Sequence, residues 1–507
     1  MGNVTTPWAD DPLRGKADDG FNRSPTAETI AGFMDAVFSA ESSIVFGVTG
    51  PWGSGKSSLL NMIVETLTSD AHPDRDRWVV TAFSPWAAES VAGLLAEFGS
   101  ALAAALPIDE REMQGARDRR RTLARQIART MESVPYLGGL SRVTQDALST
   151  EKTFRESFEE NANLFRAAAL RVLVVVDDVD RLHRDELPSL LKAIRLLGRF
   201  PGVNYLLAYD EQTLTDNIRA SGVGADDPAR AQLFLEKIVQ YQFGVPPLRY
   251  EVALAQIEQG LRDELATQGR QLSADQCRRL PSVYRHCQAL LTTPRAVRRY
   301  LAHYRWDLMR TPAGEVDDVD VALVTLLRLQ APADFRRLHS LRDALTTTND
   351  HRAVSSIIEA LSQDSGVRAV LASLFLSLPR WRGGICDAEY FDRYFVGIDT
   401  SYDIADSDVR LAVESAEVGD HRPLLRAIGG EGPAVVSAQR KARLLLRGRA
   451  PRPELLGTVL EADRIASAGR RVLHFETWLA EGLAEVAMTA PEQSNDQNLW
   501  MALGEVT

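Results

Sequence analysis

The sequence predicts an α/β protein in which a parallel sheet with flanking helices is followed by mainly helical chain. Three observations predict this class. An apolar run, a glycine-rich loop and a helical pattern follow one another between residues 43 and 67, and a second aliphatic run, 171–176, ends in two aspartates. Beyond about residue 250 strand patterns almost vanish. Apolar runs that alternate with helical patterns are typical of parallel sheets.

Length and composition are those of an ordinary globular protein. The chain has 507 residues, of which 45% are apolar and 25% charged, so it is long enough for several domains. The formal net charge of −11 argues against a protein that coats nucleic acid through bulk charge. Cys277, Cys287 and Cys386 have no metal-like spacing, and no signal peptide is evident, so we expect a cytoplasmic protein with reduced cysteines.

A glycine-rich loop follows the first expected strand. The strand covers residues 43–48, and a helical pattern over residues 58–67 follows the loop. The loop matches the phosphate-binding pattern G-x-x-x-x-G-K-[ST] at every fixed position. A turn that fits by chance is the alternative, but strand, loop and helix in this order are what phosphate binding requires. The predicted nucleotide-binding residues are Gly50, Pro51, Trp52, Gly53, Ser54, Gly55, Lys56, Ser57 and Ser58.

The residues of this loop have separate expected roles. Its backbone N–H groups are expected to point inward at a helix N-terminus, where they cradle an anion. Lys56 is expected to reach the β- and γ-phosphates of a nucleotide, and the Ser57 hydroxyl to bind Mg²⁺. The sequence therefore predicts a P-loop NTPase core.

The second aliphatic run supplies the carboxylates that such a core needs. Residues 171–176 read as a strand buried on both faces, and Asp177 and Asp178 follow it. We expect Asp177 to hold Mg²⁺ through water and Asp178 to orient the attacking water, although the residues alone leave open which acid does which. A buried strand that leads into a solvated acidic turn is the alternative.

The remaining core elements continue the alternation. Helices are expected over residues 26–38 and 187–197, and strands over residues 78–83 and 203–210. Residues 1–24 are polar and are expected to form an N-terminal arm.

The interval between the two phosphate motifs bears on membrane association. Residues 91–108 are nearly uncharged, and their length borders on a membrane span. Their bulky side chains fall on one stripe at helical spacing, which favours an amphipathic or buried helix, so we expect no membrane span. A helical insertion over residues 109–165 carries the basic stretch Arg117–Arg129. That stretch can contact nucleic acid or an acidic partner, but such runs are usually solvated surface.

Six ordered blocks resemble the KAP family of P-loop NTPases, a branch of the STAND/AAA-like class. Tryptophan precedes the second glycine of the phosphate loop, and Ser84 stands where the family's Phe-Asn-x-Trp signature has asparagine. The blocks are Gly50–Ser58, Ala82–Trp86, Asp177–Leu182, Leu206–Asp210, Leu235–Gln240 with Pro246 and Pro247, and Thr293–Tyr300.

The resemblance implies further site residues and a cofactor. It implies ATP with Mg²⁺ as the ligand, Asp210 as a sensor of the γ-phosphate, and Arg295 as a lid arginine that closes on it. A helix N-cap is the alternative for Asp210, and a surface helix position the alternative for Arg295. An additional arginine often stabilises transition-state charge, and Arg181, Arg199 or a neighbouring subunit are candidate sources.

The resemblance also implies an organisation and a role. The expected parts are an arm (1–24), the NTPase core (25–248), a helical lid (249–310) and a C-terminal helical domain (311–507). Many family members carry transmembrane helices between the phosphate motifs, whereas this interval suggests a member without them. The closest role is the ATPase subunit of a Qat-type bacterial phage-defence system, with QueC-like and TatD-like partner proteins.

Three classes of function remain open from the sequence. The first is a slow, partner-regulated ATPase that acts as a conformational switch in a multi-subunit complex and forms oligomers. The second is a nucleic-acid-stimulated ATPase motor that uses Arg117–Arg129. The third is a nucleotide-bound scaffold that does not hydrolyse ATP.

Overall fold

The chain divides into two compact units, each described here by itself. The first comprises Met1–Gln256 and Thr292–Ala296, and the second comprises Ile257–Leu291 and Val297–Thr507. The structure, a computed structural model, describes residues 11–69, 78–85, 90–105, 158–159, 161–163, 165–167, 170–183, 186–197, 200–221, 228–311, 313–348, 350–376, 383–395, 404–418, 420–429 and 432–446. The basic stretch Arg117–Arg129, Arg199, Trp86 and residues 447–507 lie outside the described residues.

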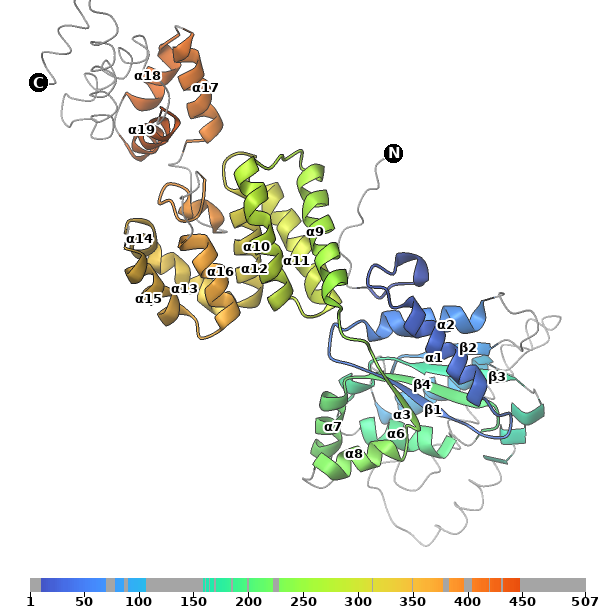
Figure 1. Ribbon diagram of the computed structural model, residues 1–507. Coiled ribbons are helices and arrows are strands. Elements are labelled where there is room, and N and C mark those ends of the chain that lie inside the picture. The colour runs from blue at the N-terminus through green and yellow to red at the C-terminus, as the bar shows by residue number, and fades with distance from the viewer. Residues whose placement is uncertain are drawn as a thin grey trace, which may run out of the picture. The chain divides into compact units, whose positions relative to one another are not determined.

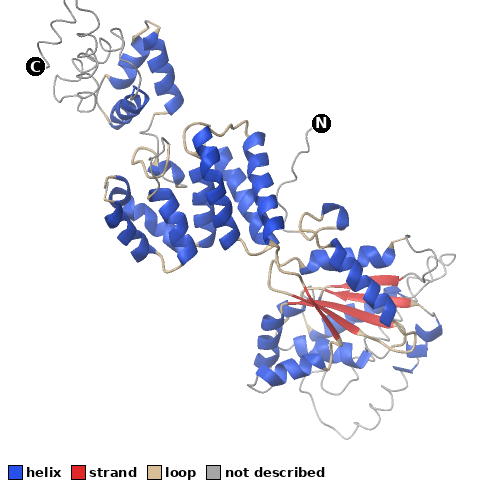
Figure 2. Ribbon diagram, viewed as in Figure 1, coloured by secondary structure: helices blue, strands red, loops and turns tan. Residues whose placement is uncertain are grey.

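A parallel five-stranded sheet organises the first unit (Figure 2). Its strand order is β2-β3-β4-β1-β5, so β4 lies between the strand before the glycine loop and the strand before the acidic turn. The strands are β1 (Val45–Thr49), β2 (Trp78–Phe83), β3 (Arg171–Val176), β4 (Val203–Tyr209) and β5 (Tyr241–Gly244). Because all neighbours pair in parallel, the loops that follow β1, β3 and β4 meet at one edge of the sheet.

Helices cover both faces of this sheet, which gives three layers (Figure 1). The helices α1 (Ser24–Val37) and α2 (Lys56–Thr68) pack on one face, over Phe46, Leu173 and Leu206. The opposite face carries α3 (Val91–Ala105), α6 (Glu186–Leu197), α7 (Glu211–Ala220) and α8 (Pro228–Glu236). Burial on both faces explains why β3 and β4 are continuous aliphatic and aromatic runs without alternation.

The apolar segment between the phosphate motifs is part of this core. In α3, Leu94, Leu95, Phe98 and Leu102 are at most 1% exposed. The Phe98 ring meets Phe83 edge-on at 5.5 Å and stacks on Tyr205 at 5.9 Å between centroids. The described part of this segment is therefore a sheet-covering helix. Among the residues that the structure describes, no helix has the length and apolar character needed to cross a membrane.

One strand was not expected from the sequence. Strand β5 is only four residues long, and its side chains are mostly exposed, so it carries neither an apolar run nor a clear alternation. It pairs with β1 at the sheet edge and is recognisable only from that pairing. The expected strands, and the helices expected over residues 26–38, 58–67 and 187–197, lie within about two residues of their expected positions. The helices α7 and α8 had no expected range.

The described residues of the second unit form helices joined by turns and loops. Its helices are α9 (Tyr250–Thr267, which begins in the first unit), α10 (Ala274–Leu290), α11 (Pro294–Arg310, likewise), α12 (Asp318–Gln330), α13 (Pro332–Leu338), α14 (Arg342–Thr346), α15 (His351–Leu361), α16 (Ser365–Phe375), α17 (Asp406–Glu417), α18 (Arg422–Ile428) and α19 (Pro433–Leu446). Side-chain caps begin several of them; Ser273 and Gln276 form a capping box at α10.

The α/β core with a helical remainder confirms the expected fold class.

Candidate nucleotide-binding site

The glycine loop leaves β1 in a conformation that its glycines make possible. Gly53 and Gly55 have φ angles of +78° and +95°, in the left-handed region that favours glycine. The Ser54 N–H donates to the Pro51 carbonyl at 3.1 Å, which closes the turn. Helix α2 begins at Lys56, and no side chain of the described residues caps its first N–H groups. Uncapped N–H groups at a helix start after left-handed glycines are what the predicted anion cradle requires.

Lys56 already points into this loop. Its side chain is 8% exposed, and its ammonium donates to the Gly50 carbonyl at 2.8 Å and to the Pro51 carbonyl at 3.4 Å. An ammonium has three N–H donors, so one is left for an anion. Burial lowers the pKa of Lys56, while the negative charges of four aspartates oppose this shift. In decreasing order of effect, these are Asp180, Asp210, Asp177 and Asp178. The site thus gathers four carboxylates around one lysine.

The acidic turn after β3 is strained. Asp178 has φ +55° and ψ +38°, a left-handed conformation that only Asn22 and Asp178 share among the described non-glycine residues. Its carboxylate pairs with the Arg181 guanidinium at 3.0 Å, and its N–H donates to Asp177 Oδ1 at 2.8 Å. Burial, followed by the neighbouring Asp177 charge, raises the pKa of Asp178. The turn thus holds a strained, partly desolvated carboxylate, a common arrangement at catalytic sites.

The sequence did not predict that Trp52 and Asp180 contact each other. Asp180 is 3% exposed, and its Oδ2 accepts a hydrogen bond from the indole N–H of Trp52 at 2.6 Å, across 128 residues of sequence. Asn217 of α7 donates to the Asp180 carbonyl at 3.0 Å. Both Trp52 and Asp180 lie within family motif blocks, which was the available signal, but their contact depends on the fold.

Asp210 stands at the carboxyl end of β4, between the loop and the acidic turn. Its side chain caps α7 by accepting from the Thr213 N–H at 2.9 Å, which is the alternative that the sequence set beside the sensor role. Its charge also acts on Lys56. Because a carboxylate has further lone pairs, the cap and a role toward a phosphate are compatible.

Arg295 reaches the loop through its backbone. Its N–H donates to the Gly53 carbonyl at 3.3 Å, within the first unit. A Cβ placed on Gly53 would lie 3.0 Å from the Arg295 Cβ and 3.3 Å from the Thr293 Oγ1. The Thr292–Ala296 segment therefore packs on the loop tip, and the Arg295 side chain is exposed there.

The serines of the loop differ in their surroundings. Ser58 Oγ accepts a hydrogen bond from the Leu13 N–H at 3.1 Å, whereas Ser57, at the position that binds Mg²⁺ in the phosphate-loop pattern, is half-buried. Ser54 Oγ is buried without a hydrogen-bond partner among the described residues, and so is Asp180 Oδ1. Buried polar atoms are normally satisfied. One such atom in the glycine loop and one in the acidic turn therefore fit a polar ligand.

The donor set also fits a divalent cation that arrives with its ligand. Within the described ranges, no group of three or more His, Cys, Asp or Glu side chains is arranged to hold a metal ion. Mg²⁺ is usually bound by one or two carboxylates together with substrate phosphates and water. Ser57 and Asp177 are the residues that would hold it.

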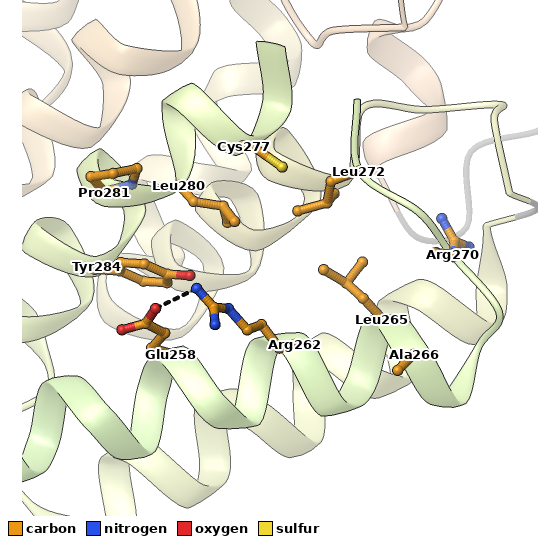
Figure 3. Close-up of a pocket in the computed structure, with 10 residues that line it drawn as sticks. All are labelled: Glu258, Arg262, Leu265, Ala266, Arg270, Leu272, Cys277, Leu280, Pro281 and Tyr284. Carbon is orange, nitrogen blue, oxygen red and sulfur yellow. Dashed lines mark hydrogen bonds and ion pairs between the residues drawn. The ribbon is translucent and has the colours of Figure 1, made fainter. Parts of the chain in front are cut away.

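A cavity in the second unit is a different kind of site. It has a volume of about 430 Å³ and lies between α9 and α10 (Figure 3). Arg262 and Glu258 form an ion pair at 2.6 Å at its wall, so their charges offset one another. The rest of the wall is mostly apolar, and such a cavity is a poor match for a triphosphate. Its lining residues are Glu258, Arg262, Leu265, Ala266, Arg270, Leu272, Cys277, Leu280, Pro281 and Tyr284.

The fold and the site together define a P-loop NTPase domain. The model of the KAP family P-loop domain matches residues 23–305, which is more than half of the chain. The chain belongs to the KAP family, as its motif blocks indicated.

Relatives of known name are distant. The phage T7 exclusion protein of Escherichia coli (strain K12) is 26% identical over 234 residues, a match that covers 41% of this chain and 30% of that protein. Two solved Aeropyrum pernix structures align with TM-scores of 0.32. The ORC2 protein is 12% identical, with 76% of this chain and 86% of that chain covered. The ORC1 protein in complex with DNA is 14% identical, with 71% and 79% covered.

Proposed function

We propose that the chain hydrolyses ATP and acts as a conformational switch within a multi-subunit anti-phage defence complex. The observation that carries the hydrolytic part is the placement of Lys56. Its ammonium is held by the Gly50 and Pro51 carbonyls inside a loop that faces the carboxylates of the acidic turn. Positioning and charge stabilisation are most of what phosphoryl transfer needs from a protein.

The residues of the loop and turn would divide this work. The free N–H of Lys56 and the first N–H groups of α2 bind and orient the phosphates. Mg²⁺, when bound, supplies positive charge to a site in which four aspartates act on Lys56 and Arg181 pairs with one of them. Asp178, whose pKa is raised, is suited to accept a hydrogen bond and then a proton from the attacking water.

The choice of ATP and of a defence role rests on family resemblance. The named relative is a phage T7 exclusion protein, but the match covers only 30% of its length. The Qat-type resemblance adds QueC-like and TatD-like proteins as partners, and a switch of this kind predicts slow turnover. Arg181 is paired with Asp178 in the present arrangement. Arg199, the other candidate in this chain, lies outside the described residues. We propose that a neighbouring subunit of an oligomer supplies the charge-stabilising arginine.

The test compares ATP hydrolysis by the wild type and by Lys56→Ala, with and without DNA, alongside the mass in solution with ATP. We expect Lys56→Ala to lower kcat/KM about 100-fold or more, since it removes a preorganised cation. Lys237→Ala is the matched control. It deletes an exposed lysine just before β5, at the opposite edge of the parallel sheet, and is expected to hydrolyse like the wild type.

Other outcomes would select the other classes of function. Equal hydrolysis by the wild type and Lys56→Ala would refute the site. Strong stimulation by DNA would favour the nucleic-acid motor over the switch. Tight ATP binding without turnover in the wild type would favour the scaffold.

A further inference from the structure

The indole of Trp52 combines an exposed ring with a hydrogen bond to a buried group. The side chain is 62% exposed, so the core does not require its bulk. Its N–H nevertheless donates to Asp180 Oδ2 at 2.6 Å, while Asp180 is only 3% exposed. Hydrogen bonds to ionised carboxylates are roughly twice as strong as neutral ones. This bond therefore fixes a residue of the phosphate loop to the turn that carries Asp177 and Asp178.

The turn end of this bond is itself held. The Asp180 carbonyl accepts from Asn217 Nδ2 of α7, and α7 is capped by Asp210. The second carboxylate oxygen, Oδ1, is buried without a hydrogen-bond partner among the described residues. Of the four aspartates that act on Lys56, Asp180 has the largest effect. Asp180 thus acts on Lys56 through its charge and on the loop through the Trp52 hydrogen bond.

The loop needs such support because its own chain is flexible. Gly53 and Gly55 lie on either side of Ser54, and glycines lose more conformational freedom on ordering than other residues. A loop that orders only when phosphate arrives must offset that entropy from binding energy. Besides the Lys56 and Ser54 bonds within the loop, the contacts that hold it before binding include the Trp52 bond to Asp180 and the Arg295 N–H bond to the Gly53 carbonyl.

We propose that Trp52, Asp180 and Asn217 are positioning residues that hold the phosphate loop in its binding conformation before nucleotide arrives. This inference rests on the proposed function of the loop. The hydrogen bond needs only the Trp52 N–H and an accepting oxygen on residue 180. The exposed face of the indole ring is not required for it.

The test measures the affinity of the full chain for ADP with Mg²⁺ by calorimetry, which avoids hydrolysis. Trp52→Phe keeps an aromatic ring and loses the N–H, and Asp180→Ala loses the acceptor. We expect each to weaken ADP binding about 3- to 30-fold, and the double variant to be no more than about threefold weaker than either. Asp180→Asn keeps an accepting oxygen and is expected to stay within about threefold of the wild type.

Two further measurements separate positioning from folding. Trp306→Phe, which changes an indole that is 44% exposed on α11, is the matched control and should bind ADP like the wild type. At saturating ATP, kcat of Trp52→Phe should change less than KM, and its urea midpoint should stay near that of the wild type. A fold defect would move kcat and the midpoint together.

The inference is wrong if Trp52→Phe binds ADP as tightly as the wild type, or if the effects of Trp52→Phe and Asp180→Ala simply add. Failure of the proposed function looks different, because the wild type would then bind no nucleotide or would bind it as well after Lys56→Ala.

Discussion

Replacing Asp178 by asparagine should separate catalysis from stability. The residue occupies a left-handed conformation (φ +55°) that asparagine tolerates about as well as aspartate does. The change removes the carboxylate charge and keeps the size. If Asp178 activates the attacking water, kcat for ATP should fall about 100-fold or more, since general bases contribute about 10²- to 10⁴-fold.

The effect on folding is expected to be small, because opposing contributions meet at this side chain. Loss of the ion pair with Arg181, whose two side chains are 43% and 31% exposed, costs about 0.2–1 kcal/mol. Against this, burial and Asp177 raise the pKa of Asp178 in the folded state. The folded protein then binds the proton of Asp178 more tightly than the unfolded chain does. Ionisation of Asp178 therefore lowers the free energy of unfolding as pH rises above the ordinary pKa of an aspartate. Asparagine does not ionise, so the variant does not lose stability in this way at pH 7. The net change in its free energy of unfolding should stay within about 1 kcal/mol.

The assay pairs steady-state ATP hydrolysis with urea unfolding of the same preparations. Asp216→Asn is the matched control, because Asp216 is an exposed aspartate on α7 that also pairs with an arginine at i+3. Undiminished hydrolysis by Asp178→Asn would refute the role in activating water. A decrease of more than about 2 kcal/mol in the free energy of unfolding would refute the stability argument, since the carboxylate would then be essential to the fold.

Four other predictions concern the candidate site and the core that supports it. The kcat of the wild type should fall at low pH through the raised pKa of Asp178, above the ordinary 3.8, and a pH–rate profile of Asp178→Asn should lack that limb. Chelation of Mg²⁺ by EDTA should reduce hydrolysis to background, and added Mg²⁺ should restore it, because the negative charges of four aspartates act on Lys56 and a triphosphate would add more. Gly53→Ala should weaken ADP binding at least about tenfold, because residue 53 has φ +78° and its new Cβ would lie 3.0 Å from the Arg295 Cβ. Gly269→Ala is the control: residue 269 has φ +64° but open space around it, so the variant incurs only the backbone cost of about 1–2 kcal/mol and should bind ADP normally. Phe98→Ala should destabilise the first unit by about 3–5 kcal/mol in urea unfolding, and retention of full stability would contradict the core position of α3.

Local patterns were sufficient for most of the core. The branched aliphatics of β3 and the aromatic and aliphatic run of β4 are continuous because both faces of the sheet are covered, and that signal lies within six or seven residues. The stripe that includes Leu94 and Phe98 likewise predicted a buried helix. Strand β5 was not predicted because its four residues, three of them exposed, carry no apolar pattern and form a strand by pairing with β1.

The site divides in the same way. The glycine spacing, Lys56 and Ser57 are properties of eight consecutive residues, so the sequence by itself was sufficient to predict a phosphate-binding loop with a Mg²⁺ ligand. It also determined that Asp177 and Asp178 end a buried strand. Sequence alone left the alternatives for Asp210 side by side, because the cap on Thr213 and the charge effect on Lys56 both depend on where β4 lies in the sheet.

Tertiary structure alone decided how these pieces meet. Trp52 and Asp180 are 128 residues apart in the sequence. Parallel pairing brings the carboxyl ends of β1, β3 and β4 to one edge of the sheet, and there the indole N–H of Trp52 donates to the buried Asp180 carboxylate. The packing of Arg295 on Gly53 likewise joins segments that are far apart in the sequence. The physical reason is that strand order and side-chain contact are global properties, whereas a phosphate loop is encoded in one short segment.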